Sequence, residues 1–171
     1  RENTVEGMIG IKSYSDWNNL RLDAVSAARE ALGDNFVHKT KLPFNEYFHY
    51  LRKSIFTLAP RGFCPSSYRL YEAMSAGAIP IYVWEKELLL PYSGMINWNE
   101  TIITIERRNL FNLGQRINEV FLNKSMMRMM RKNGQYVSSI LFSVDNVIHT
   151  LNEWVFYGNY SRLLRPRHDI S

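Results

Sequence analysis

The sequence predicts an α/β fold, namely a Rossmann-like parallel sheet with flanking helices. Short apolar segments alternate with segments of helical periodicity through the first two-thirds of the chain, an order typical of such a sheet. The length of 171 residues suits one domain, and 46% hydrophobic residues can fill its core. We place this domain at residues 1–157 and expect residues 158–171 to form a polar tail.

The first half of the chain is predicted to hold three strands and two helices. Leucine and alanine recur at helical spacing in the first of these helical segments. This segment has an N-cap candidate at Asp16 or Asn18 and ends before Gly33. Pro43 precedes a second segment whose aromatic and leucine residues share one helical face. The predicted order is a strand at residues 5–11, a helix ending at residue 32, a strand at 35–38, a helix at 44–53 and a strand at 55–59.

The second half begins with a helix and a strand and ends in helices. The helix starts near Ser67 and stops at Gly77, and Pro80 opens the strand, where its missing N–H does little harm. Four methionines near residue 128 are expected to pack into the core through one helical face. The remaining elements are expected as a strand at 79–83, a loop at 88–98, a strand at 101–105 and helices at 109–122, 125–141 and 145–157.

The composition limits the classes of partner. The formal net charge of +5 favours anionic ligands, but the basic residues are scattered and no nucleic-acid-binding motif accompanies them, so we expect no nucleic-acid partner. The single cysteine, Cys64, excludes an internal disulfide framework and cannot build a metal site by itself. No apolar run is long enough to cross a bilayer. Because the chain begins at Arg1 rather than methionine, we expect an excised or processed segment.

Most of the functional information lies in residues 56–83, where a strand, a loop, a helix and a second strand follow one another. The loop holds Arg61 and Gly62, and the start of the helix adds the hydroxyls of Ser66 and Ser67. Such loops and helix N-termini meet at the carboxyl edge of a parallel sheet, where sheets of this class bind ligands. An arginine, backbone N–H groups and hydroxyls in one place suit a phosphate.

Each of these features also has an ordinary structural explanation. Arg61-Gly62 alone is typical of a turn with an exposed arginine, and a serine at a helix start usually caps the helix, which contributes about 1 kcal/mol. Arg69 and Glu72 lie three residues apart, so spacing alone favours a local ion pair worth about 0.2–0.5 kcal/mol. In the functional alternative Arg69 reaches phosphates, and the Glu72 carboxylate accepts hydrogen bonds from ribose hydroxyls.

The order of these residues is more specific than any one of them. The pattern P-R-G-x4-S-x-R-x2-E-x4-G-x-I-P, from Pro60 to Pro80, resembles the exostosin-like glycosyltransferases of family GT47. The similarity covers residues 55–105 and continues through Leu90-Pro91 and Asn97-Trp98. The resemblance implies the donor-binding C-terminal half of a GT-B enzyme. Such an enzyme would transfer a hexose or pentose from a nucleotide sugar, with a UDP-sugar as the expected donor, to a glycan hydroxyl with inversion.

The resemblance also implies a set of donor-binding residues. They are Arg61, Gly62, Ser66, Ser67, Arg69, Glu72, Arg21 and Glu85. Within this set the arginines and Ser67 would hold the diphosphate and Glu72 the ribose, while Glu85 stands where the family usually has aspartate. Two positions depart from the family pattern: Ala78 replaces a cysteine, and Trp84 replaces a small residue, which is expected to alter the base or sugar pocket.

The family mechanism implies that arginines and helix N-termini neutralise the leaving group, so we expect no metal ion and no other cofactor. The sequence agrees in having no D-x-D triplet. The catalytic base is not identified. His38 and His49 are candidates by chemistry, although a lone histidine is more often structural, and His149 and His168 are weaker candidates.

A typical eukaryotic member of this family would work in the lumen of the Golgi or secretory pathway, and otherwise the protein would be cytoplasmic. The N-glycosylation patterns at Asn99, Asn123 and Asn159 fit a lumen. An acceptor-binding domain missing from this chain is an expected partner. The alternatives are a non-catalytic half-domain that needs a partner for turnover, a polyanion binder, and a different α/β phosphate binder. The absence of G-x-G-x-x-G and G-x4-G-K-[ST] motifs disfavours the last of these.

Overall fold

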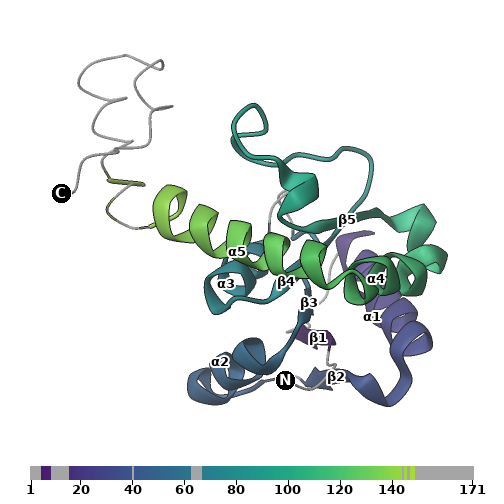
Figure 1. Cartoon of the computed structure of the whole chain (residues 1–171). Helices are drawn as coiled ribbons and strands as arrows, with labels where there is room; N and C mark the ends of the chain where they lie inside the picture. Colours follow the sequence, from purple (N-terminus) through teal and green to yellow (C-terminus); the bar gives the residue numbers. More distant parts are fainter. Residues whose placement is uncertain are drawn as a thin grey trace.

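The computed structural model describes residues 5–8, 16–39, 41–62, 67–143, 145, 147 and 148. Its centre is a five-stranded sheet in the order β2-β1-β3-β4-β5, in which every neighbouring pair runs parallel (Figure 1). The strands are β1 (Val5–Met8), β2 (Phe36–Lys39), β3 (Phe56–Leu58), β4 (Ile79–Trp84) and β5 (Ile103–Glu106). The helices are α1 (Asp16–Leu32), α2 (Phe44–Lys53), α3 (Tyr68–Ala76), α4 (Leu113–Leu122) and α5 (Lys124–Leu141).

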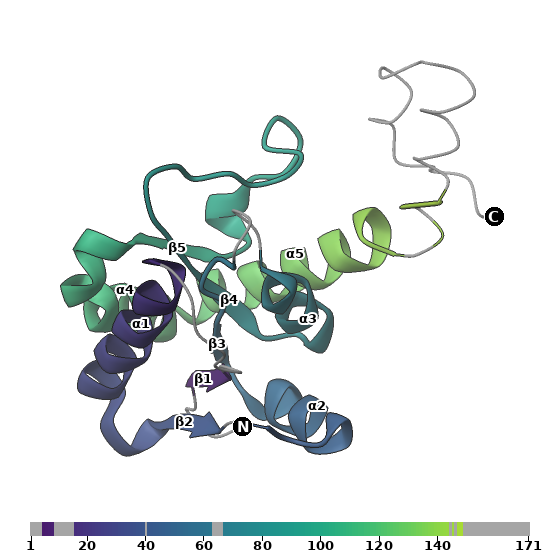
Figure 2. The ribbon, with the colours of Figure 1, turned by 180° about the vertical axis from the view of Figure 1, so that it is seen from behind.

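Helices cover both faces of the sheet. On one face, apolar side chains of α1 and α4 form a core with those of β3, β4 and β5. On the other face, α3 packs over a second core that includes Tyr82 and Trp98, and α2 lies beside α3. Figure 2 shows the pair α1 and α4 on one side of the strands and the pair α2 and α3 on the other. Parallel strands need such crossover helices, which bury both faces of the sheet.

The last helix, α5, closes the amino edge of the sheet. It runs from α4 to α3 and contributes to both cores (Figure 1). Arg131 Nε donates to the carbonyl of Gly77 at 2.7 Å, and Asn133 Nδ2 donates to the carbonyl of Glu100 at 3.0 Å. Because these carbonyls precede β4 and β5, α5 lies along the edge where the strands begin. None of the helices described is long and apolar enough to span a membrane.

The predicted class, a Rossmann-like parallel sheet with flanking helices, is confirmed by the strand order and directions. The helix expected at residues 44–53 has those limits. Gly77 ends α3 with φ 76°, and a Cβ atom there would lie 2.9 Å from Gln135 Nε2, so the stop predicted at this glycine is confirmed. Met126, Met127 and Met130 of α5 pack into the core, as expected for one methionine face.

Two expected boundaries are wrong. β5 begins two residues later than predicted, because Thr101 belongs to the preceding 3₁₀ turn, where its Oγ1 donates to the carbonyl of Asn97 at 2.8 Å. The helix predicted at 109–122 starts at Leu113, since the residues before it form a 3₁₀ helix at Arg107–Asn112. Residues 9–11, most of the helix predicted at 145–157 and the tail at 158–171 lie outside the described residues, so the domain limits stay a prediction.

Candidate functional site

The candidate site lies at the carboxyl edge of the sheet, between β1 and β3. These strands are neighbours, but the chain leaves β1 toward β2 on one side and leaves β3 toward β4 on the other. A sheet of this kind has its topological switch point there, and ligands bind in the crevice outside the strand ends. α1 follows β1 and α3 follows β3, so the first turns of both helices lie at this edge. Arg21 lies in the second turn of α1, and Arg69 lies in the first turn of α3.

Arg21 and Arg69 lie close enough to repel each other. Burial lowers the pKa of Arg21 below its usual value, and the positive charge of Arg69 lowers it further. The Arg69 side chain is only 19% exposed, and its Nε and Nη1 make no hydrogen bond within the described part of the chain. Two guanidinium groups brought together in partial burial need a negative charge between them. Glu72 supplies one such charge to Arg69, and an anion bound beside the two arginines would supply another.

Glu72 and Tyr47 support Arg69 from the side. Glu72 Oε2 lies 3.5 Å from Arg69 Nε and also accepts a hydrogen bond from the Tyr47 hydroxyl. The Arg69 guanidinium lies 4.3 Å from the centroid of the Tyr47 ring, in cation–π contact. The local ion pair expected from spacing is thus present. Tyr47 is a site residue that the sequence reasoning missed, because a tyrosine on the apolar face of α2 gives no signal beyond core packing.

The loop after β3 places Arg61 on the face covered by α3. The backbone N–H of Arg61 donates to the carbonyl of Val83 at 2.9 Å, so the parallel ladder continues past the end of β3. Arg61 Nε is buried and has no hydrogen-bond partner in the described ranges. Gly62 beside it is half-buried, and Ser66 lies outside the described residues.

Ser67 stands at the N-cap position of α3 in an extended conformation and is 7% exposed. Its side chain makes no capping hydrogen bond, so the expectation that this serine caps the helix with its hydroxyl is wrong. Ser67 and the first N–H groups of α3 lie at the same edge of the sheet as Arg69.

Glu85 belongs to a second cluster at the same edge. Arg107, just after β5, forms ion pairs with Asp23 of α1 at 2.6 Å and with Glu85, just after β4, at 2.9 Å. Hydrogen bonds to Asp23 and then to Glu85 raise the pKa of Arg107 above its usual value. These two ion pairs, which we call the Arg107 clamp, connect the ends of β4 and β5 to α1. Asp23, the residue of α1 in the clamp, lies two positions after Arg21. The structure thus pairs Glu85 with Arg107, and Arg107 is a residue that the sequence reasoning missed.

The two candidate bases lie in different surroundings. His38 lies on β2, which β1 separates from β3, and burial followed by the charge of Arg29 lowers its pKa. His49 is exposed on α2, where its ring contacts Tyr50 edge to face. His149 and His168 fall outside the described residues. Neither His38 nor His49 is assigned a catalytic role by these surroundings. Across the described ranges, no three His, Cys, Asp or Glu side chains gather as metal ligands would.

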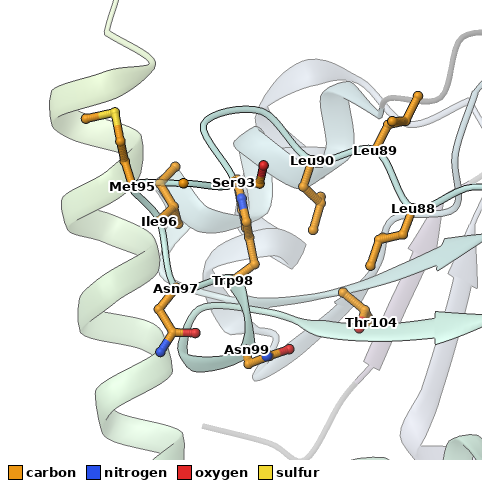
Figure 3. Close-up of a pocket in the computed structure, with 11 residues that line it drawn as sticks. Leu88, Leu89, Leu90, Ser93, Met95, Ile96, Asn97, Trp98, Asn99 and Thr104 are labelled. Carbon is orange, nitrogen blue, oxygen red and sulfur yellow. The ribbon is translucent and has the colours of Figure 1, made fainter. Parts of the chain in front are cut away.

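A separate groove of about 600 Å³ lies in the connection between β4 and β5. Figure 3 shows Trp98 at its centre, with Leu88, Leu89 and Leu90 on one side and Met95 on another. Trp98 Nε1 donates to the carbonyl of Pro91 at 3.0 Å, and this hydrogen bond joins the two ends of the segment 91–98. The groove is lined by residues 88–90, 93–99 and 104, so it includes none of the arginines described above.

Comparison with known sequences gives one family. The model of the Exostosin GT47 domain matches residues 15–120. Exostosin-1c of Danio rerio is 29% identical over 126 residues, which are 71% of this chain and 16% of that protein. Exostosin-1 of Bos taurus is 30% identical over 112 residues, 63% of this chain and 14% of that protein. The probable glucuronoxylan glucuronosyltransferase IRX7 of Arabidopsis thaliana is 25% identical over 115 residues, 67% of this chain and 25% of that protein.

Comparison with solved structures gives the fold. Sucrose-phosphate synthase from Thermosynechococcus elongatus superposes with a TM-score of 0.62 and 13% identity, over 92% of this chain and 47% of that one. The C-terminal domain of a group 1 glycosyl transferase, LpcC from Francisella tularensis, gives a TM-score of 0.58 and 11% identity, over 82% of this chain and 87% of that one. The expected likeness to one half of a GT-B glycosyltransferase is therefore confirmed for the fold.

Proposed function

The chain belongs to the exostosin GT47 family, and from this premise we propose that it is the donor-binding half of a glycosyltransferase. Its donor is a nucleotide sugar, with a UDP-sugar as the specific proposal, and its acceptor is a hydroxyl of a glycan. In the reaction the bond between the anomeric carbon and the diphosphate breaks, and its electron pair leaves with the diphosphate. The acceptor oxygen bonds to the opposite face of that carbon, and its proton passes to a base.

The pairing of Arg21 with Arg69 at the switch point carries this proposal. Burial and the nearby charge of Arg69 disfavour the positive charge of Arg21, and a diphosphate bound beside the two guanidinium groups would offset both effects. The charge that develops on the leaving diphosphate then meets positive groups that are already in position, which is how such groups lower a barrier. The N-terminus of α3 and Ser67 add donors at the same edge. No metal ion is needed in this scheme.

Glu72 is the proposed ligand of the ribose. Both of its contacts with described residues, from the Tyr47 hydroxyl and from Arg69, involve Oε2. Oε1 therefore keeps its acceptor sites, and a carboxylate accepts up to about four hydrogen bonds in all. Since the side chain is 41% exposed, ribose hydroxyls can reach it.

The test is calorimetric titration of the chain with UDP, GDP, ADP and their common sugar conjugates, with EDTA present and then with Mg²⁺. We expect saturable binding of one nucleoside diphosphate, unaffected by EDTA. Arg69→Ala should weaken it by about 1.5–3 kcal/mol, the usual worth of a hydrogen bond to a charged group. Arg128→Ala is the matched control, because that arginine is exposed on α5 at the opposite edge of the sheet.

Three results would contradict different parts of the proposal. Equal nucleotide affinity in a folded Arg69→Ala variant would remove Arg69 from the binding site. Failure of the unaltered chain to bind any of these nucleotides would refute nucleotide binding by this chain. An equal loss in Arg128→Ala would show that overall positive charge, rather than the site, attracts the ligand.

One observation favours a second candidate, a half-domain that binds the donor but needs a partner domain for turnover. The chain spans only 14% to 25% of the length of the curated relatives compared here and matches 47% of the sucrose-phosphate synthase chain. Donor hydrolysis and sugar transfer by the chain alone separate the two candidates. Binding without either reaction would support the half-domain.

We further propose that the protein acts in the lumen of the Golgi or secretory pathway. N-linked glycans attached at Asn99 or Asn123 would support this location.

A further inference from the structure

Tyr82 has a buried hydroxyl that the fold does not use. The side chain is 1% exposed and belongs to the core under α3. Its hydroxyl makes no hydrogen bond within the described part of the chain. Buried polar groups are nearly always paired in native proteins, because an unpaired donor loses its water without compensation. An unpaired group of this kind needs an explanation, and one explanation is a ligand that pairs with it.

The strand register places Tyr82 and Arg61 on the same face of the sheet. Leu58 pairs with Ile81, and the ladder continues because the N–H of Ala59 donates to the carbonyl of Ile81 and that of Arg61 to the carbonyl of Val83. Tyr82 is therefore the neighbour of Ala59, and Arg61 follows two residues later on the same side. The charge of Arg61 acts on the Tyr82 hydroxyl, which shows that the two groups are close.

The polar groups gathered here are donors. Burial raises the pKa of Tyr82 to about 12, against the opposing effect of Arg61, so its hydroxyl keeps its proton at physiological pH. Arg61 carries a permanent positive charge, and its buried Nε–H has no partner among the described residues. A neutral O–H and a cationic N–H with no hydrogen-bond acceptor among the described residues are complementary to an oxyanion.

We propose that Tyr82 is a ligand-binding residue whose hydroxyl donates a hydrogen bond to the same oxyanion that Arg61 binds. This inference rests on the proposed function, because the oxyanion belongs to the sugar-nucleotide donor. A phosphate of the diphosphate and a carboxylate on the transferred sugar share this chemistry.

The test compares Tyr82→Phe with the unaltered chain by calorimetric titration of pyrophosphate, UDP-glucose and UDP-glucuronate. We expect affinity to fall about tenfold or more, since a hydrogen bond to a charged group is lost and tenfold corresponds to about 1.4 kcal/mol. A loss with all three probes identifies the diphosphate as the oxyanion. A loss with UDP-glucuronate alone identifies the sugar carboxylate. Tyr136→Phe, at an exposed tyrosine of α5, is the control.

Thermal unfolding without ligand gives an independent readout. Because the Tyr82 hydroxyl is unpaired in the free chain, Tyr82→Phe should leave the Tm unchanged or raise it. A clearly lower Tm would show that the hydroxyl is paired in the free chain and would overturn the proposal. Unchanged affinity for all three probes would overturn it as well, while leaving donor binding intact. If the unaltered chain bound none of the probes, this inference and the proposed function would both fall.

Discussion

The Tyr47 hydroxyl is predicted to hold the side chains of Glu72 and Arg69 on α3 in place. Tyr47→Phe removes only this hydroxyl and keeps the ring, which stays in contact with the Arg69 guanidinium. A hydrogen bond to a charged group is worth about 1.5–3 kcal/mol, but the Glu72 side chain is 41% exposed, so water can replace the lost donor. We therefore expect the free energy of unfolding to fall by about 1 kcal/mol, or the Tm by about 2–4 °C.

A double-mutant cycle isolates this contact. The four proteins are the unaltered chain, Tyr47→Phe, Glu72→Gln and the double variant, each unfolded in urea. If the hydroxyl acts through Glu72, the two substitutions should be coupled by at least about 0.5 kcal/mol. Tyr136→Phe reports the effect of losing an exposed tyrosine hydroxyl on the same chain.

Ligand binding gives a second measure of the same contact. Without the Tyr47 hydroxyl, Glu72 is less well oriented, so the affinity for UDP should fall severalfold. The affinity for pyrophosphate, which has no ribose, should change little. Additive effects in the cycle, or equal losses for UDP and pyrophosphate, would refute the claim that Tyr47 positions Glu72.

Two further predictions concern the frame around the site. Arg107→Ala removes two partly exposed ion pairs worth about 0.2–1 kcal/mol each, so urea unfolding should show a loss of about 1 kcal/mol that shrinks in 1 M salt. The same loss in Arg108→Ala, whose side chain is 79% exposed, would argue against a specific clamp. Gly77→Ala should destabilise the chain by more than about 1 kcal/mol, because φ is 76° and the new Cβ would lie 2.9 Å from a side-chain nitrogen. Gly33→Ala should lower the free energy of unfolding by less than Gly77→Ala does. Gly33 also has a positive φ, 53°, but no atom lies within 4 Å of its Cβ position. Equal losses in the two variants would show that the steric contact at Gly77 does not contribute.

The helices and strands of this fold could be predicted well, because most of them are determined by residues within or next to the element itself. α2 has the predicted limits, since Pro43 precedes it and its apolar residues share one face. The stop of α3 at Gly77 follows from the same kind of signal, a residue that adopts positive φ without strain. The boundaries that failed depend on contacts outside the element. Thr101, for example, reads as strand by pattern but is held in the preceding turn by a hydrogen bond to Asn97.

The candidate site was predictable as a set of residue types, but its contacts were not. Arg21 and Arg69 are 48 positions apart in the sequence and lie on helices that cover opposite faces of the sheet, so only the strand order brings them together. Tyr47 reaches Glu72 from a different helix for the same reason. Arg107 gave no signal because its partners come from two other elements. Spacing within one helix did predict one contact, the pair of Arg69 with Glu72.

The two edges of the sheet differ in how completely their polar groups are paired. At the amino edge, side chains of α5 donate to the backbone carbonyls that precede β4 and β5. At the carboxyl edge, buried N–H and O–H groups of Arg61, Arg69 and Tyr82 lack hydrogen-bond partners among the described residues, although Arg69 forms an ion pair with Glu72. Unpaired buried donors reduce stability, so a chain shaped by stability alone would have replaced them with apolar side chains. Their gathering at the ends of the strands, where a sheet of this class binds ligands, is what the proposed anion would explain.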